Sequence, residues 1–509
     1  MKIKASYIEE PDLIFGNQRE EKDPKTGLKY FGPYFSPSEE TPSPMQIRVG
    51  IIGNSITVAL AKQILKLLGE EIKSNETNPW VFPDFPGFRL DNAIRCGFVS
   101  SDTWNATITD SEIKHILAIS DINARIAAAS DLFAEKIEKI ALEDSPPHVI
   151  ICALPKELEE YCGISERTRG AKRPKFTELE KAIEEMKREG QTFLSQWCLE
   201  VEVEVVEKSS RSYDFRNALK GKAMKFNIPT QILRETTARS ILDYPESKGK
   251  IRQPPATFAW NLSTALYYKA HGRPWRLAKL TVGTCYVGIS FYRSLLNPNQ
   301  NLETAMAQVF THSGEGFVLR GSDVTVDKQT REVHLTKSQS FDLLAHSIKK
   351  YSEKVNALPS RIVLHKTSSF SNEEIEGFNE AVGAIPKDYV TISENTDLRF
   401  LRTGKYPVLR GTLISLTQNQ HLLYTTGYTP RVRTYPGPRI PKPLLITHQG
   451  DSEIELICKE ILGLTKLNWN TTAFSTESPI TLEFARQVGR ILSEASKDVV
   501  LRDHYRFYM

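Results

Sequence analysis

Strand-like and helix-like segments alternate along much of this chain, and their order limits the fold more than any other feature. QIRVGII at 46–52 is typical of a buried strand, and apolar residues at helical spacing follow Gly53-Asn54-Ser55. A second buried strand is indicated at 148–154. Strands separated by helices usually form parallel sheets, so residues 46 to about 270 predict an α/β domain with a largely parallel sheet.

Gly50-Ile51-Ile52-Gly53 stands where the first of these strands leads into its helix. It lacks the full Gly-x-Gly-x-x-Gly pattern that brings a backbone close to a dinucleotide. We therefore interpret it as a packing turn, and we expect no NAD to bind to this chain.

The pattern changes after residue 276. TVGTCYVGISFYR at 281–293 predicts a strand, and helices are expected at 340–356 and 372–382, on either side of a strand at 361–364. Several strands followed by alternating helices and strands is the order of an RNase H fold. In a nuclease of that fold the first strand carries an aspartate that holds a divalent metal, but this strand carries Ser290.

Composition excludes some classes of protein and leaves others open. The net charge is only +4, but basic residues gather at 167–175 and 207–225, which favours a phosphate-binding groove over general stickiness and leaves a pair of solvated loops as the alternative. No apolar stretch approaches the 18 residues of a membrane span, and the first residues lack the apolar core of a signal peptide. The 6 cysteines show no Cys-x-x-Cys spacing, so we expect reduced thiols in a cytoplasmic protein.

The order and spacing of several local sequences carry a resemblance to a known family. Three segments resemble the corresponding parts of Argonaute PIWI domains: 261–277, 360–378 and 465–492. The opening YIEEPDLIFGN resembles the start of short prokaryotic Argonautes, which contain MID and PIWI domains and lack the N and PAZ domains. The resemblance implies three parts: an N-terminal extension over 1–45 that packs on the rest, a Rossmann-like MID domain over 46–270, and an RNase-H-like PIWI domain over 271–509.

A pocket for a nucleic-acid 5′ end needs several donors that converge on one phosphate, with a flat group against the first base. Arg216 and Lys220 are four residues apart in an expected helix and therefore share one face. The resemblance implies a MID pocket made of Arg216, Lys220, Gln231 and Lys269, with Tyr213 or Arg216 stacking on the base. It further implies that the C-terminal carboxylate, on Met509 here, shares a structural Mg²⁺ with the phosphate.

The resemblance also locates the nuclease positions of the PIWI domain. Two-metal cleavage needs a set of carboxylates, but the matching positions carry Ser290, Thr367 and Arg486. Glu315 is the candidate for the remaining glutamate. We therefore expect no catalytic metal and no slicing, and we expect phosphate contacts to a duplex backbone from His365, Lys366 and Arg486.

The function implied is recognition without cleavage. We expect a 5′-phosphorylated RNA guide and a DNA target, although the residues do not distinguish an RNA guide from a DNA guide. The resemblance implies a heterodimer with an APAZ-containing effector, TIR in preference to SIR2, that degrades NAD(P)⁺ in defence against plasmids or phage and that oligomerises on target binding. Two alternatives stay open: a metal-dependent nuclease using Asp323 or Glu315, and a scaffold that binds no guide.

Overall fold

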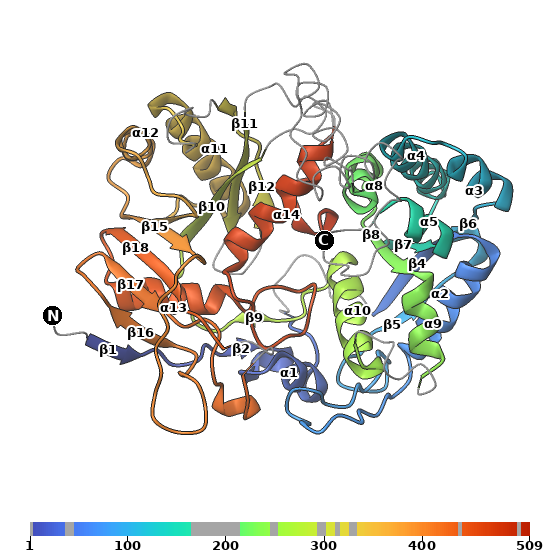
Figure 1. Ribbon diagram of the computed structural model, residues 1–509, viewed down its shortest axis with the longest axis horizontal. Coiled ribbons are helices and arrows are strands. Elements are labelled where there is room, and N and C mark those ends of the chain that lie inside the picture. The colour runs from blue at the N-terminus through green and yellow to red at the C-terminus, as the bar shows by residue number, and fades with distance from the viewer. Residues whose placement is uncertain are drawn as a thin grey trace, which may run out of the picture.

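The computed structural model in Figure 1 describes most of the chain. The described residues are 4–35, 45–163, 214–244, 253–292, 302–310, 316–324, 333–435, 440–495 and 500–509, without the side chains of 302–310 and 323. The basic cluster at 167–175, Tyr213 and Glu315 lie outside these residues, as does the side chain of Asp323. The expectations for them stay predictions.

A five-stranded sheet forms the first half of the fold, and every pair of its neighbouring strands is parallel. Its order is β5-β4-β7-β8, with β6 also paired to β4. The strands are β4 (Gln46–Gly53), β5 (Gly97–Val99), β6 (Asn105–Thr107), β7 (Val149–Leu154) and β8 (Thr230–Arg234). The two strands expected from the sequence are thus confirmed as β4 and β7.

Helices cover both faces of this sheet, which is why its central strands are apolar on both sides. The helices are α2 (Ser55–Leu67), α3 (Asp110–Leu117), α4 (Ile122–Ala141), α5 (Lys156–Tyr161), α8 (Phe215–Ala223) and α9 (Glu235–Leu242). Ile51 packs in the core that includes α2 and α9, and its neighbour Ile52 packs in the core that includes α3, α4 and α8. Gly50–Gly53 are the last residues of β4, so the turn predicted there is wrong, but close packing is present: a Cβ added to Gly53 would lie 2.6 Å from the Ala153 carbonyl oxygen.

The second half is built on a ten-stranded mixed sheet of order β1-β16-β17-β18-β15-β14-β10-β11-β12, with β13 paired to β11. The strands of residues 284–450 are β10 (Thr284–Tyr292), β11 (Leu302–Phe310), β12 (Gly316–Val318), β13 (Asp323–Val324), β14 (Arg361–Lys366), β15 (Lys387–Ser393), β16 (Thr412–Ser415), β17 (Gln420–Leu423) and β18 (Leu444–Gly450). Strands β10, β14 and β15 are parallel to one another, and the remaining pairs are antiparallel. This is the mixed arrangement expected for an RNase-H-like fold.

Two pairs of helices enclose the centre of the larger sheet. They are α11 (Lys337–Val355) and α12 (Asn372–Val382) on one face, and α13 (Ile454–Leu464) and α14 (Ile480–Glu494) on the other. Helix α14 lies between the two halves of the molecule in Figure 1, where it contacts β10 and β11 on one side and α8 on the other. The helices expected at 340–356 and 372–382 are confirmed as α11 and α12.

The N-terminal segment joins both halves. Strand β1 (Lys4–Tyr7) pairs with β16 at the edge of the larger sheet, and β2 (Leu13–Ile14) pairs with β3 (Glu20–Glu21) and with β9 (Arg276–Leu277). Helix α1 (Pro24–Phe31) follows, and the Lys25 Nζ donates a hydrogen bond to the Val81 carbonyl in the first half. The segment therefore packs on both sheets. Helix α10 (Pro255–Lys269) lies between the two halves along the chain.

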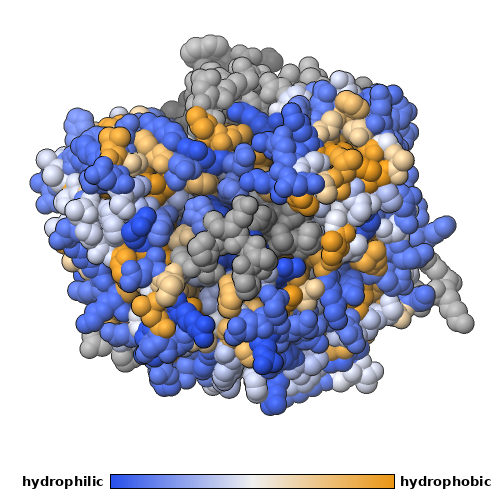
Figure 2. Space-filling model, turned by 180° about the vertical axis from the view of Figure 1, so that it is seen from behind, coloured by the Kyte–Doolittle hydropathy of each residue, from blue (hydrophilic) through white to orange (hydrophobic). Residues whose placement is uncertain are grey.

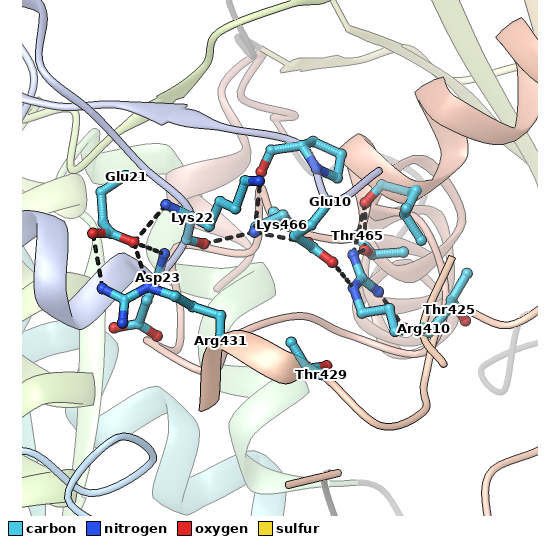
Figure 3. A network of polar contacts seen from close by, with 12 residues as sticks. Glu10, Glu21, Lys22, Asp23, Arg410, Thr425, Thr429, Arg431, Thr465 and Lys466 are labelled. Atoms are coloured by element: carbon cyan, nitrogen blue, oxygen red, sulfur yellow. Dashed lines mark hydrogen bonds and ion pairs between the residues drawn. The ribbon is translucent and has the colours of Figure 1, made fainter. Parts of the chain in front are cut away.

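Ion pairs that are buried or partly buried connect this segment to the second half, as Figure 3 shows. Glu10 accepts hydrogen bonds from Arg410 Nε at 2.7 Å and from Lys466 Nζ at 2.8 Å, and Glu21 pairs with Arg431 at 2.9 Å. Burial alone would raise the pKa of Glu10, but the charges of Arg410 and Lys466 outweigh it and lower that pKa. The glutamate is thus ionised at neutral pH, and its loss would leave two buried cations without their shared carboxylate.

The surface is mixed. The face in Figure 2 shows mainly hydrophilic residues, with hydrophobic residues in small separate patches. No helix within the described ranges is long and apolar enough to cross a membrane.

Candidate nucleic-acid interface

Helix α8 positions the first two predicted pocket residues. Its N-cap, Asp214, accepts a hydrogen bond from the Arg216 backbone N–H at 2.8 Å, and Phe215 and Leu219 bury one side of the helix in the core. Lys220 is only 2% exposed, and its Nζ donates to the Thr230 carbonyl at 2.5 Å, at the start of β8. A lysine at this depth has lost most of its water, so its charge needs a partner.

Gln231 and Lys269 complete the predicted set from two further elements. Gln231 lies on β8, and Lys269 is the last residue of α10 and 1% exposed. The Lys269 Nζ donates to the Gln231 Oε1 at 2.5 Å, although the two residues are 38 positions apart. The structure therefore places Lys269 next to Gln231 despite the long connection.

The end of the chain contacts this cluster through Arg216. Arg216 Nη2 donates a hydrogen bond to the Tyr508 carbonyl at 3.1 Å. The residue that follows Tyr508, Met509, is buried. The predicted role of the Met509 carboxylate stays a prediction. The structure thus brings together residues of α8, β8, α10 and the last turn.

The electrostatics of this cluster are unusual. Burial, and then the positive charge of Arg216, lowers the pKa of Lys269 to about 7. Burial, followed by the charges of Lys269 and Arg216, holds the pKa of Lys220 well below its ordinary value. No carboxylate of the described residues forms an ion pair with Lys220 or Lys269. A bound anion would relieve this repulsion.

The donor set suits a phosphate better than a metal ion. Its side chains are one guanidinium, two amines and one amide whose oxygen already accepts a hydrogen bond from Lys269. Divalent magnesium prefers oxygen ligands, and no group of three or more His, Cys, Asp or Glu side chains suited to a metal occurs in the described part of the chain. The side chains of this pocket therefore do not by themselves fit the expected Mg²⁺.

A glutamate that sequence reasoning missed joins the two halves beside this pocket. Glu494, at the end of α14, accepts hydrogen bonds from the Asp214 backbone at 2.8 Å and from Asn217 Nδ2 at 2.9 Å. Burial, helped by the charge of Asp214, raises the pKa of Glu494 to about 7 against the effect of these hydrogen bonds. No local sequence pattern marks this contact.

The three nuclease positions also meet in space. Ser290 on β10, Thr367 just after β14 and Arg486 on α14 line one hollow of about 600 Å³. The register of β10 against β11 shifts between Ile289 and Phe291, so a bulge lies at the serine. A Cβ on Gly288 would lie 2.2 Å from the Thr481 carbonyl oxygen, so this glycine lets α14 approach the strand.

The groups that these three positions bring to the hollow are two hydroxyls, from Ser290 and Thr367, and the guanidinium of Arg486. Arg486 Nη1 pairs with Glu394 Oε1 at 2.6 Å, and the Ser478 hydroxyl donates to the same oxygen. Burial would raise the pKa of Glu394, but these hydrogen bonds from Ser478 and Arg486 lower it. Sequence reasoning missed Glu394. The available signal was its position directly after β15, the third of the parallel strands β10, β14 and β15.

Two predicted duplex contacts are wrong. His365 is 0% exposed and shares a 2.8 Å hydrogen bond with the Thr481 hydroxyl, and burial lowers its pKa to about 3, so it is neutral at pH 7. Lys366 is 1% exposed and its Nζ pairs with Glu374 at 2.6 Å. Both residues end β14, a strand covered by helices on both faces, so they point into the protein. Arg486, with a side chain 33% exposed, is the member of the three that reaches the surface.

Comparison with known proteins identifies the fold. No family model and no curated protein sequence matches the chain. Among solved structures, Clostridium butyricum Argonaute bound to a guide DNA and a 19-mer target DNA is 16% identical with a TM-score of 0.61, covering 98% of this chain and 54% of that one. A. aeolicus Argonaute is 13% identical with a TM-score of 0.56, covering 99% and 55%, and Drosophila Piwi is 12% identical with a TM-score of 0.58, covering 99% and 56%.

The chain therefore has an Argonaute-like fold, with a Rossmann-like MID part followed by an RNase-H-like PIWI part. This confirms the expected fold class. The chain spans about half the length of the solved structures it matches.

Proposed function

We propose that this chain binds the phosphorylated 5′ end of a nucleic-acid guide at the cluster of Arg216, Lys220, Gln231 and Lys269, and pairs the guide with a complementary target. The observation that carries the proposal is the convergence of two buried lysines, Lys220 and Lys269, with the partly buried Arg216, while no carboxylate of the described residues forms an ion pair with either lysine. A terminal phosphate supplies two negative charges and several acceptor oxygens, which match these donors. Base pairing then provides sequence specificity, and the protein holds the duplex by its backbone and shape.

We propose further that the target is held without being cut. Cleavage of a phosphodiester by two metals needs a carboxylate set, and Ser290, Thr367 and Arg486 bring two hydroxyls and a cation to the hollow instead. Arg486 would repel a divalent cation at this place. The guide is RNA and the target DNA in this proposal, as the resemblance implies.

The proposal includes a partner. A recognition subunit without chemistry of its own needs an effector, and the resemblance implies an APAZ-containing protein with a TIR domain, or less favourably SIR2, in the cytoplasm. The effector would degrade NAD(P)⁺ after target recognition.

Two experiments test the core of the proposal. Nucleic acid that co-purifies with the protein from cells is extracted, labelled and sequenced, and enrichment of short 5′-phosphorylated strands is expected. A scaffold that binds no guide would show no such enrichment. In the second experiment the guide-loaded protein is incubated with labelled complementary target and Mg²⁺ or Mn²⁺, and the target should stay intact. A product cut at a position set by the guide would show that a different carboxylate set is active.

A further inference from the structure

Helix α14 presents two arginines to the hollow at the nuclease positions. Arg486 and Arg490 are four residues apart on this helix, so they lie on one face, and both line the hollow. The last turn of the helix adds Ser493 to the same lining. Two guanidiniums on one rigid element can make paired contacts to phosphate oxygens.

The rest of the lining supplies donors and no negative charge. The lining residues are Ser290, Phe291, Tyr292, Val333, Thr367, Ser368, Leu482, Ala485, Arg486, Gly489, Arg490 and Ser493. Five of them carry hydroxyls and none carries a carboxylate. A volume of about 600 Å³ exceeds what a single phosphate needs, and it leaves room for the sugars on either side of a phosphodiester.

Positive charge extends from this hollow toward the 5′-end pocket. Burial lowers the pKa of Arg216, and the positive charge of Arg490 lowers it further, while Tyr505 and Asp214 act in the opposite direction. Arg490 therefore lies within electrostatic range of Arg216. Helices α14 and α8 are in contact. One strand of nucleic acid could therefore follow the cations from Arg216 to Arg490 and Arg486.

The carboxylate of Glu394 would compete with a nucleic-acid phosphate for Arg486. This carboxylate holds Arg486 at 2.6 Å, and the two side chains are 30% and 33% exposed. Ion pairs open to water are weak, so a phosphate in the hollow can replace the carboxylate as the partner of Arg486.

We propose that the hollow is a binding site for a phosphodiester of the bound nucleic acid and that Arg486 and Arg490 contact this phosphodiester. Glu394 is the competing ligand that pairs with Arg486 when no nucleic acid is bound. This inference deepens the proposed function, on which it rests, by assigning the place of the lost metal site to backbone binding. Phosphate contacts of this kind position a duplex and carry no sequence information.

The test measures binding of two RNA–DNA duplexes by the purified full chain, one with a 5′-phosphate on its guide strand and one with a 5′-hydroxyl. We expect Arg490→Gln to weaken both duplexes about 3- to 10-fold, and each lost arginine, at 486 or 490, to lower the salt slope by about one. Glu394→Gln keeps an acceptor for Ser478 but removes the competing charge, so it should tighten binding of both duplexes several-fold. Lys114→Gln, an exposed change on α3, is the matched control and should leave affinity unchanged.

The two duplexes separate this inference from the proposed function. A change of Lys220 should matter only for the 5′-phosphorylated duplex, whereas changes of the two arginines should matter for both. The proposed phosphodiester-binding site is refuted if the double variant Arg486→Gln, Arg490→Gln binds both duplexes with wild-type affinity and has an unchanged melting temperature. It is also refuted if inorganic phosphate raises the melting temperature in an Arg490-dependent way but neither duplex depends on Arg490.

Discussion

Binding of a 5′-phosphorylated guide is expected to weaken as the pH rises above about 7, because Lys269 loses its proton in the free protein. Burial and Arg216 lower the pKa of Lys269 to about 7 from its ordinary value of 10.5. The phosphate prefers the protonated amine, so binding above that pH must take up a proton.

The size of the effect follows from that pKa. At pH 8 about one tenth of the free protein carries a protonated Lys269, which costs about 1.4 kcal/mol of binding free energy, or roughly tenfold in affinity. Each further pH unit costs the same until the pKa of Lys269 in the complex is reached. Burial, and then the charge of Lys269, also holds the pKa of Lys220 well below its ordinary value, so the dependence on pH becomes steeper if Lys220 takes up a proton as well.

The assay is a titration of labelled guide at several pH values, with calorimetry in buffers of different ionisation enthalpy to count the protons taken up. A guide with a 5′-hydroxyl is the control and should show little dependence on pH. The stability of the free protein should change in the opposite sense: the unfolded chain binds more protons between about pH 7 and 10.5, so this lysine makes the fold more stable as the pH rises through that range. Equal pH profiles for the two guides, with no proton uptake, would refute the assignment of Lys269 to the phosphate.

The remaining predictions concern single side chains. Lys220→Ala should weaken binding of the 5′-phosphorylated guide and lower the salt slope by about one, whereas Lys222→Ala, on the same helix but paired with Asp131, should do neither. Equal affinities of the two variants in a salt titration would contradict the pocket. Glu10→Gln should lower the free energy of unfolding by about 3 to 5 kcal/mol, because it leaves buried cations without their carboxylate. Glu9→Gln, at an exposed neighbour, should stay within about 0.5 kcal/mol in the same denaturant titration.

Most of the secondary structure could be predicted because the local signals are strong. The buried runs of β4 and β7 and the capped helices α11 and α12 are visible as periodic patterns with clear ends. The same patterns predicted an RNase-H-like order of elements. These patterns could not show that His365 and Lys366 are buried. Polar residues at the end of a strand usually face solvent, but helices cover both faces of β14 up to its last residue.

The ionic contacts between distant segments were not predictable at all. Glu394 holds Arg486 across 92 residues, and Glu10 meets Lys466 across 456. Acidic and basic side chains are frequent everywhere in the chain, so local sequence does not select which of them pair. The choice is made by which strand ends lie next to each other.

The chain's own residues decide the chemistry available at each position: hydroxyls and a guanidinium at Ser290, Thr367 and Arg486, and cations at Lys220 and Lys269. These identities hold in any fold. Only the tertiary structure decides their state, because burial and neighbouring charges arise when segments far apart in sequence pack together. The lowered pKa of Lys269 and the meeting of Ser290, Thr367 and Arg486 in one hollow are properties of that packing.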